Sequence, residues 1–219
     1  MKAQGIEIDL PRLRPSRGQL LDHFASQSGA PVAATLNPDD VTAGLISREN
    51  KRESAILMPI VQKADELEII LTWRSAHLRS HAGQVSFPGG RVDESDASRE
   101  HTALRETEEE IGIPMNRVQV LGRMGDYYTQ SGYSITPVVG LIDTPVELRP
   151  NPHEVAAIIE APLHFFLDSA AYRIHQRETD GTVRSFYSVT YGDYFIWGAT
   201  AAMLVEFYRR LAAFMVGGG

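Results

Sequence analysis

The feature that most constrains the fold of this chain is a helix predicted over residues 97–111, which contain neither Gly nor Pro. Gly112 follows it and a proline comes two residues later, the usual order of residues at the C-terminal end of a helix. With about 100° between successive residues, Leu104, Thr107 and Ile111 fall on one side. We expect this side to pack against the rest of the protein.

Three glutamates of this helix, Glu106, Glu109 and Glu110, are predicted to gather on the opposite side, within roughly a third of a turn. Like charges at this spacing repel one another and destabilise a helix. No lysine is placed to offset them, and Arg105 can neutralise only part of the charge. A hard divalent cation fits the remaining need, because Mg²⁺ takes oxygen ligands from carboxylates, waters and substrate phosphates. The three glutamates are therefore candidate metal ligands.

The segment before the helix has the opposite charge. Residues 69–92 contain three arginines, two histidines and no acid, whereas residues 93–110 contain eight acids and two arginines. Arginines bind phosphates through a fork of N–H donors, and glycines let the backbone approach a ligand closely. A basic, glycine-rich loop beside an acidic helix indicates a site for a metal and an anionic substrate. The candidate substrate-binding residues are Arg74, Arg79, Gly89 and Gly90.

The rest of the chain predicts a mixture of hairpins and separated helices. Strands are expected at residues 55–61, 67–73, 118–122, 135–142, 155–159, 173–178 and 183–191, and helices at 17–28, 162–172 and 198–216. Pro59 suggests that its strand lies at a sheet edge or bulges there. The Trp197 segment is interpreted as packing at the start of the last helix. The expected fold class is α/β, a sandwich with a mixed β-sheet in one domain.

Composition narrows the classes of function. The 219 residues include 21 basic and 28 acidic ones, a net charge of −7, which argues against a general binder of nucleic acid or membrane surfaces. A bound metal can still reverse the local sign for a polyanionic small substrate. The absence of cysteine removes disulfides, thiol catalysis and cysteine-ligated metals. No secretory signal or membrane-spanning apolar run is visible, so a cytoplasmic protein is expected.

The acidic helix resembles the Nudix box, which runs from a glycine through an acid to Arg-Glu-apolar-x-Glu-Glu-x-Gly-apolar. Residues 105–113 read Arg-Glu-Thr-Glu-Glu-Glu-Ile-Gly-Ile, so only Thr107 departs from that half of the motif. The first half is looser: Asp96 stands where the family usually has Glu, with one extra residue before Arg105. A structural role such as capping the helix would tolerate Asp there.

The resemblance implies a Nudix-type α/β/α sandwich that binds Mg²⁺ or Mn²⁺. In that reading Glu106 and Glu110 hold the metal, and Glu109 ligates a second metal or accepts the proton of the attacking water. Arg105 orients a glutamate through a bidentate contact. Glu154 begins a strand where family members often supply another acid to the site.

The basic segment is similar to the extra motif of the coenzyme A pyrophosphatase branch of this family. The similar residues are Leu71–Arg79 (Leu-Thr-Trp-Arg-Ser-Ala-His-Leu-Arg), then Gly83, then Phe87-Pro88-Gly89-Gly90, and also residues 194–200. The resemblance implies an enzyme that cleaves coenzyme A at its diphosphate into 3′,5′-ADP and 4′-phosphopantetheine. Arg74 and Arg79 would then grip phosphates, including the 3′-phosphate.

Residues 1–45 carry none of this resemblance. We therefore expect an N-terminal helical arm or extension over residues 1–45 and a Nudix hydrolase domain over residues 46–216. Two alternatives stay open: a Nudix pyrophosphatase for another nucleoside-diphosphate derivative or dinucleotide, and a non-catalytic module that senses a nucleotide. The three retained box glutamates weigh against the second. The expected partner is the small coenzyme A-type substrate, without nucleic acid or membrane, and homodimer formation stays open.

Overall fold

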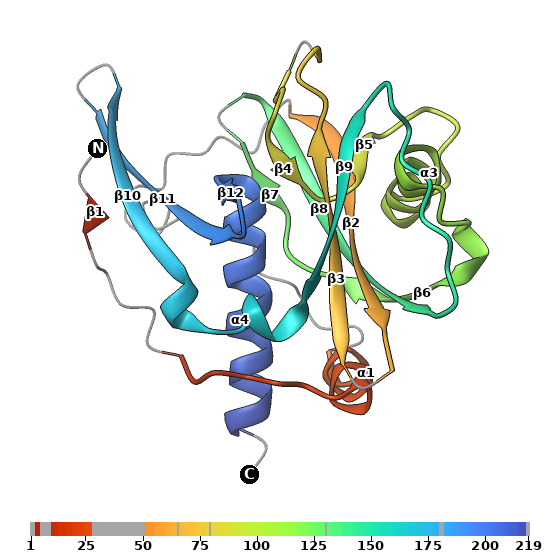
Figure 1. Ribbon diagram of the computed structural model, residues 1–219, viewed down its shortest axis with the longest axis horizontal. Helices are drawn as coiled ribbons and strands as arrows, with labels where there is room; N and C mark the ends of the chain where they lie inside the picture. Colours follow the sequence, from red (N-terminus) through yellow and green to blue (C-terminus); the bar gives the residue numbers. More distant parts are fainter. Residues whose placement is uncertain are drawn as a thin grey trace.

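The computed structural model describes residues 3–4, 10–27, 51–64, 66–78, 80–129, 131–179 and 182–217. In this part of the chain two β-sheets pack with three α-helices, α1 (Arg17–Ser26), α3 (Arg99–Ile111) and α4 (Ala199–Gly217) (Figure 1). The domain boundary predicted at residue 45 lies outside the described residues.

The larger sheet has eight strands in which β4, β3, β2, β8 and β6 follow one another, while β5 pairs with β2, β7 with β8 and β9 with β3. The pair β2·β8 is parallel and all others are antiparallel, so the sheet is mixed, as expected. The strands are β2 (Arg52–Gln62), β3 (Leu67–Arg74), β4 (Val85–Ser86), β5 (Gly89–Arg91), β6 (Val118–Arg123), β7 (Tyr127–Tyr128), β8 (Tyr133–Asp143) and β9 (Val155–Pro162).

The centre of this sheet is buried on both faces. Ala55 and Leu57 of β2 pack with Ala103 of α3, whereas Ile56 and Met58 join the cluster that holds residues of α1 and α4. Alternate side chains of a strand point to opposite faces, so an uninterrupted apolar run lets one strand serve two layers. Figure 1 shows α3 on one side of the sheet and α4 on the other.

Pro59 does not mark an edge strand. β2 lies inside the sheet and pairs with β8 along its whole length, with no break in register at Pro59. On its other side β2 pairs with β5 at residues 54–56 and with β3 at residues 60–62. The Leu57 N–H donates toward that side, to Pro88. Residue 59 faces the same way, so proline removes no donor from the ladder with β8.

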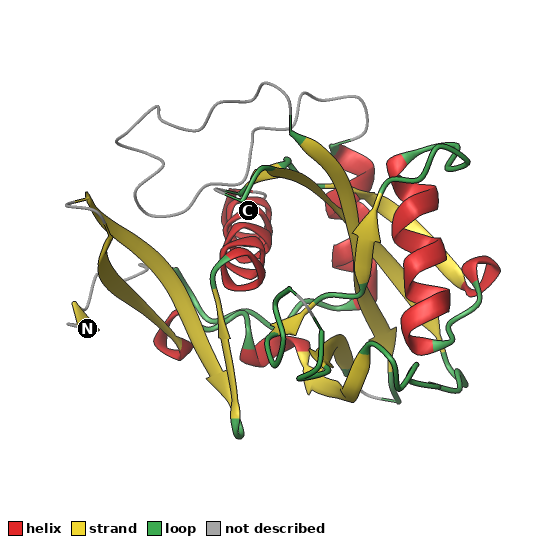
Figure 2. Cartoon of the chain, turned by 90° about the horizontal axis from the view of Figure 1, so that it is seen from above, coloured by secondary structure: helices red, strands yellow, loops and turns green. Residues whose placement is uncertain are grey.

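The second sheet is antiparallel, in the order β1-β10-β11-β12, and α4 lies between it and the larger sheet (Figure 2). Its strands are β1 (Ala3–Gln4), β10 (Tyr172–Thr179), β11 (Thr182–Tyr191) and β12 (Tyr194–Trp197). One face, with Ile174, Tyr187, Val189 and Ile196, belongs to the same core cluster as α4. The antiparallel pairing of β10 with β11 confirms the predicted hairpin of residues 173–191. The other face of this hairpin points away from the core.

The predicted helix over residues 162–172 is wrong in form. Two 3-10 turns occupy it, η2 (Leu163–Phe165) and η3 (Ser169–Ala171). Asp168 has extended backbone angles and its side chain accepts the Ala170 N–H, so it starts a new turn instead of continuing a helix.

Among the described residues, no helix combines the length and apolarity needed to cross a membrane.

Candidate active site

The ends of α3 fix its position next to the loop that precedes β9. Ser98 caps the start by accepting the His101 N–H, and Gly112, at φ 76°, ends the helix in the left-handed region. The carbonyls of Glu110 and Ile111 accept the N–H groups of Asn151 and Arg149, both at 2.8–2.9 Å. These bonds hold the loop against the helix end, and Glu154 follows directly in the chain.

The expectation that all three glutamates point away from the packed side of α3 is wrong. The side chain of Glu110 is 2% exposed and that of Glu106 is 17% exposed, and both lie on the packed side; only that of Glu109, at 57%, faces water. The helix packs here against β2 and β5. β5 begins with two glycines, which leave room for carboxylates where other side chains would stand.

Gly89 and Gly90 shape the surface under these carboxylates. A Cβ on Gly90 would overlap the carboxylate of Glu106. A Cβ on Gly89, which has φ +155°, would overlap the carbonyl of Ala55. Both glycines also line the large cavity described below. Gly89 and Gly90 are the predicted substrate-binding pair. Because they have no side chains, only their backbone lies between the glutamates of α3 and the cavity.

Arg105 links the loop before α3 to two of the glutamates. Its Nε and Nη2 donate to the two carboxylate oxygens of Asp96 at 3.0 and 2.9 Å. Its Nη1 donates to Glu106 at 2.9 Å and to Glu109 at 3.3 Å. Arg105 thus holds Glu106 in position, as predicted for its role, although the bidentate contact is to Asp96.

Asp96 does not cap the helix, since Ser98 does. Its buried carboxylate accepts from Arg105, from Thr102 at 2.8 Å and from the Asp93 N–H at 2.9 Å. The hydrogen bonds from Arg105 hold the pKa of Asp96 far below its usual range. Asp96 is therefore a positioning residue for the guanidinium of Arg105.

Arg74 approaches the buried carboxylate of Glu110, with 3.4 Å between Nη1 and Oε1. The Nε of Arg74 and the Oε2 of Glu110 are buried, and neither has a hydrogen-bond partner among the described residues. Burial raises the pKa of Glu110 to about 8; repulsion from Glu154 and Glu106 adds to the rise, and Arg74 opposes it. Burial also raises the pKa of Glu106, against the effect of Arg105.

A shift in strand register brings Glu154 to the same place. The pairing of β3 with β9 slips between Trp73 and Arg74, so Arg74 stands opposite Val155. The Ser75 N–H donates to the Glu154 carbonyl at 2.8 Å. The Glu154 carboxylate is close enough to raise the pKa of both Glu106 and Glu110. The structure thus brings together Arg74, Arg105, Glu106, Glu109, Glu110 and Glu154, while Arg79 lies outside the described residues.

The donor set fits a hard divalent cation. Among the described residues no three acidic or histidine side chains already converge as metal ligands, because Arg105 holds Glu106 and Arg74 holds one oxygen of Glu110. However, the second oxygen of Glu110 is buried and has no hydrogen-bond partner among the described residues. Carboxylates whose pKa is raised by burial and mutual repulsion are stabilised in their charged form by a bound cation. Oxygen-only ligands favour Mg²⁺ or Mn²⁺.

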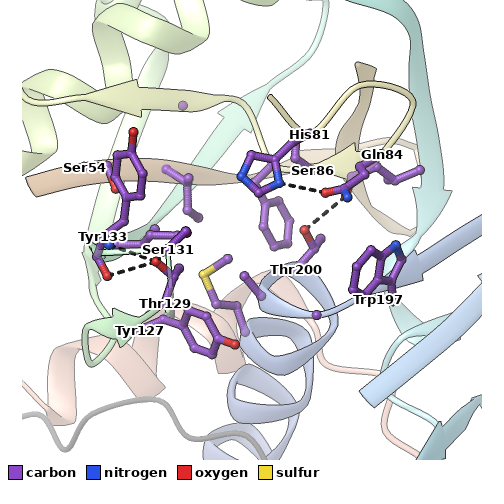
Figure 3. A pocket seen from close by; sticks show the side chains of 18 of the residues that line it. Ser54, His81, Gln84, Ser86, Tyr127, Thr129, Ser131, Tyr133, Trp197 and Thr200 are labelled. Atoms are coloured by element: carbon purple, nitrogen blue, oxygen red, sulfur yellow. Dashed lines mark hydrogen bonds between the residues drawn. The ribbon is translucent and has the colours of Figure 1, made fainter. Parts of the chain in front are cut away.

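A cavity of about 1070 Å³ opens beside this cluster and reaches the second sheet and the start of α4. Figure 3 shows Tyr133 and Trp197 on opposite sides of it, with His81 and Thr200 between them. Its described lining contains no acidic residue. The arginines in the lining are Arg74, Arg91, Arg177 and Arg184, and the aromatic residues other than His81 are Phe87, Tyr127, Tyr128, Tyr133, Phe186, Phe195 and Trp197.

Several of these residues were not found from the sequence. Trp197 was interpreted as packing, but it is 37% exposed and lines the cavity. Tyr133, Arg177 and Arg184 carry no local signal, because they reach the cavity only through the way the two sheets face each other. The hydroxyl of Tyr133 accepts a hydrogen bond from Arg91 at 3.1 Å. This contact depends on how β5 and β8 lie in the sheet, so the sequence around Tyr133 does not reveal it.

Comparisons with known proteins identify the family. The model of the NUDIX domain matches residues 51–189, which include α3, β5 and Glu154. The chain belongs to the Nudix family. This Nudix protein is 44% identical over 163 residues to the uncharacterized Nudix hydrolase NudL of Photorhabdus laumondii, covering 74% of this chain and 87% of that protein. The uncharacterized Nudix hydrolase NudL of Yersinia enterocolitica is 40% identical over 194 residues, covering 87% and 96%.

Solved structures share the arrangement more distantly. A Nudix hydrolase from M. smegmatis, RenU, aligns with a TM-score of 0.46 at 20% identity, over 55% of this chain and 80% of that one. The C. elegans Ap4A hydrolase aligns with a TM-score of 0.44, also at 20% identity, over 50% and 80%. The site therefore rests on the geometry of this Nudix protein itself.

Proposed function

We propose that this Nudix hydrolase cleaves the diphosphate of coenzyme A, or of a coenzyme A derivative, to 3′,5′-ADP and 4′-phosphopantetheine. One observation carries the substrate assignment. The segment similar to the coenzyme A pyrophosphatase motif supplies Arg74, Gly89 and Gly90 to the wall of one cavity, directly beside Glu106 and Glu110. The described part of the lining has four arginines and no acid, which suits a substrate with several phosphates.

The proposed metal ligands are Glu106 and Glu110, with Glu109 close by on the same helix. A bound Mg²⁺ or Mn²⁺ would neutralise charge on the diphosphate and supply an activated water. The protein's own part is positional. Arg105, held by Asp96, keeps Glu106 turned toward Gly90, and the backbone of Gly90 lets substrate phosphate approach without a side chain between them.

Arg74 is the proposed ligand of the diphosphate. In the present arrangement it neutralises Glu110, and its Nε has no partner among the described residues. With a cation bound at Glu110, the guanidinium of Arg74 would be available to phosphate oxygens in the cavity that it lines. Arg79, five residues later, stays a proposed phosphate ligand. Two carboxylates are available to accept the proton of the attacking water, Glu109 and Glu154.

A substrate panel tests the proposal. With Mg²⁺ or Mn²⁺, the purified protein should hydrolyse coenzyme A in preference to NADH, ADP-ribose, diadenosine polyphosphates and nucleoside triphosphates, with products identified by mass. Strong turnover of ADP-ribose with negligible turnover of coenzyme A would contradict it and favour another nucleoside-diphosphate substrate. Tight nucleotide binding without any turnover would favour a sensor.

A further inference from the structure

The hydroxyl of Tyr133 accepts hydrogen bonds from two arginines. Arg91 donates to it through Nε at 3.1 Å and also through Nη2, and the Nη1 of Arg52 donates at 3.4 Å. Both guanidinium groups lie 5.4–5.5 Å from the centre of the tyrosine ring. Burial opposes the shift, but the two arginines lower the pKa of Tyr133 below its ordinary value. Two positive charges therefore converge on one neutral oxygen.

The positive charge of this pair is not neutralised within the part of the chain that the structure describes, where neither arginine makes an ion pair. The acids next to them in the sequence make contacts elsewhere. Glu53 pairs with Arg99, and Asp93 accepts hydrogen bonds from Ser95. A neutral phenol accepts hydrogen bonds but cannot offset two charges, and its own O–H proton stays available to a further acceptor. The group lacks an anion.

The cluster belongs to the face of the larger sheet that forms the cavity wall. Arg91 of β5 stands opposite Ser54 of β2, and Tyr133 of β8 stands opposite Arg52 of β2. Residues 52 and 54 share one face of the strand, because side chains alternate between faces. Ser54, Arg91 and Tyr133 all line the cavity, and Figure 3 shows Ser54 and Tyr133 together at one side of it. The unneutralised charge is therefore directed at the ligand cavity.

Two contacts place the backbone of Arg91 next to Glu106. Gly90, the preceding residue, is so close to this glutamate that a Cβ there would overlap its carboxylate. The carbonyl of Arg91 accepts from the Nη2 of Arg105 at 3.2 Å, and the Nη1 of the same guanidinium donates to Glu106 at 2.9 Å. Because side chains alternate along a strand, Gly90 faces the glutamate while Arg91 faces the cavity.

We propose that Arg91 and the hydroxyl of Tyr133, with Arg52 adding charge, bind a phosphate group of the substrate beside the proposed metal site. This inference rests on the proposed function. Phosphate oxygens would accept from the guanidinium and from the phenol, and would neutralise the converging charges. Arg74 lies at the other glutamate, Glu110, so the two arginines approach the substrate from opposite ends of the glutamate pair. Coenzyme A offers two groups of this chemistry, the diphosphate and the 3′-phosphate, and the test distinguishes them.

Steady-state kinetics on coenzyme A tests the binding role. Arg91→Gln should raise KM about ten- to a hundredfold with little change in kcat. Tyr133→Phe keeps the ring and removes the hydroxyl, and should raise KM about three- to tenfold. Arg91→Lys keeps the charge but not the fork of donors, and should recover part of the loss. The matched control is Arg12→Gln, which removes an exposed arginine outside the cavity lining and should keep the KM of the wild type.

A comparison with 3′-dephospho-coenzyme A identifies the phosphate that is bound. If the cluster binds the 3′-phosphate, Arg91→Gln raises KM for coenzyme A but not for the dephospho form. If it binds the diphosphate, KM rises equally for both, and either result supports the inference. Unchanged KM values for both substrates in Arg91→Gln overturn it. A loss confined to kcat also overturns it, because Arg91 would then act on the glutamates through Arg105 and not on the substrate.

Calorimetry separates this inference from the proposed function. In the presence of Mg²⁺, the wild type should bind ADP or adenosine 3′,5′-bisphosphate at least about tenfold more tightly than Arg91→Gln does. If the wild type hydrolyses coenzyme A while Arg91→Gln matches it in kinetics and in binding, the inference is overturned and the proposed function stands. If the wild type hydrolyses neither form of coenzyme A, the proposed function fails and calorimetry decides the inference. Equal binding of both ligands by wild type and variant, or no binding of either by the wild type, then overturns it.

Discussion

Arg105 and Asp96, nine residues apart in the chain, are joined by two hydrogen bonds of 3.0 and 2.9 Å. Asp96 is fully buried, and the remaining terminal nitrogen of Arg105 donates to Glu106. The buried aspartate therefore acts through the arginine on Glu106, which is a proposed metal ligand. From the sequence, Asp96 was predicted only to have a structural role such as capping the helix. Its contact with Arg105 depends on how the loop before α3 folds back onto the helix.

Replacing Asp96 with Asn should lower turnover at least tenfold. Asn offers one acceptor oxygen and no charge, so the guanidinium of Arg105 loses its fixed position and Glu106 loses its orientation. Leaving a buried charged group poorly paired should also cost about 1–3 kcal/mol in the free energy of unfolding. Steady-state kinetics and urea unfolding measure the two effects. Asp96→Glu is the control and should recover most of the turnover; full activity of Asp96→Asn would contradict the positioning role.

Glu106→Gln and Glu110→Gln should each remove most of the turnover while the fold stays intact. If either variant keeps near-normal activity at saturating Mg²⁺, that residue is not a principal ligand. In the metal-free protein, the folded-state pKa of Glu110 is raised to about 8 from an ordinary value of 4.5. Between these pH values the folded state holds a proton that the unfolded state has lost, so stability falls as pH rises. In EDTA, the advantage of Glu110→Gln in Tm should therefore grow from pH 5.5 to pH 8.

Gly90→Ala should reduce activity although it adds only one methyl group. That Cβ would overlap the Glu106 carboxylate, so the glutamate must leave its position beside β5. We expect a higher Mg²⁺ concentration for half-maximal activity and a lower kcat. Gly18→Ala is the matched control, because its Cβ would meet nothing closer than 3.8 Å, and alanine favours a helix over glycine. Equal metal requirements for Gly90→Ala and the wild type would show that the close approach has no role.

The ends of α3 and the hairpin of β10 and β11 could be predicted because their signals are local. Gly112 is the kind of residue that ends a helix, and the two strands of the hairpin are close neighbours in the sequence. Thr107 and Ile111 are buried, as predicted, but the burial of Glu106 and Glu110 beside them could not be predicted. Apolar periodicity treats a glutamate as a solvent-facing residue, and nothing within the helix reveals that Gly90 of β5 makes room for Glu106.

The cavity shows a second limit of sequence reasoning. Arg74 could be assigned to the site because its whole segment resembles a known motif. Arg177 and Arg184 belong to a hairpin whose strands were predicted, but their place in the cavity lining depends on how the second sheet is placed across α4. Placement of this kind is decided by the core cluster shared between the sheets, which involves residues far apart in the chain.

His23 of α1 should make the stability of the protein depend on pH. It is fully buried between the rings of Phe24 and Phe214, with centroids 5.0 and 5.2 Å away, and its ring nitrogens have no partner among the described residues. Burial lowers its pKa, and the charge of Arg210 lowers it further. Below pH 6.5 the unfolded state therefore binds a proton that the folded state rejects, so stability falls as pH falls.

His23→Leu should flatten this dependence. The slope contributed by one histidine is at most about 1.4 kcal/mol per pH unit. Urea unfolding at pH 7.5 and pH 5.5 measures it, and His101→Gln, a change to a half-exposed histidine bound to Asp96, controls for a general effect of losing an imidazole. An unchanged slope in His23→Leu would mean that His23 is protonated inside the folded protein.

Glu154 and Glu109 should give different losses when each is changed to Gln. The Glu154 carboxylate is close enough to Glu106 and Glu110 to raise the pKa of both, whereas Glu109 is largely exposed and bound to Arg105. We therefore expect Glu154→Gln to lower kcat by about 10²–10⁴, the usual contribution of a general base. Glu109→Gln should chiefly raise the Mg²⁺ concentration needed for activity. If Glu109→Gln lowers kcat by this factor and Glu154→Gln changes only the Mg²⁺ requirement, the two roles are exchanged.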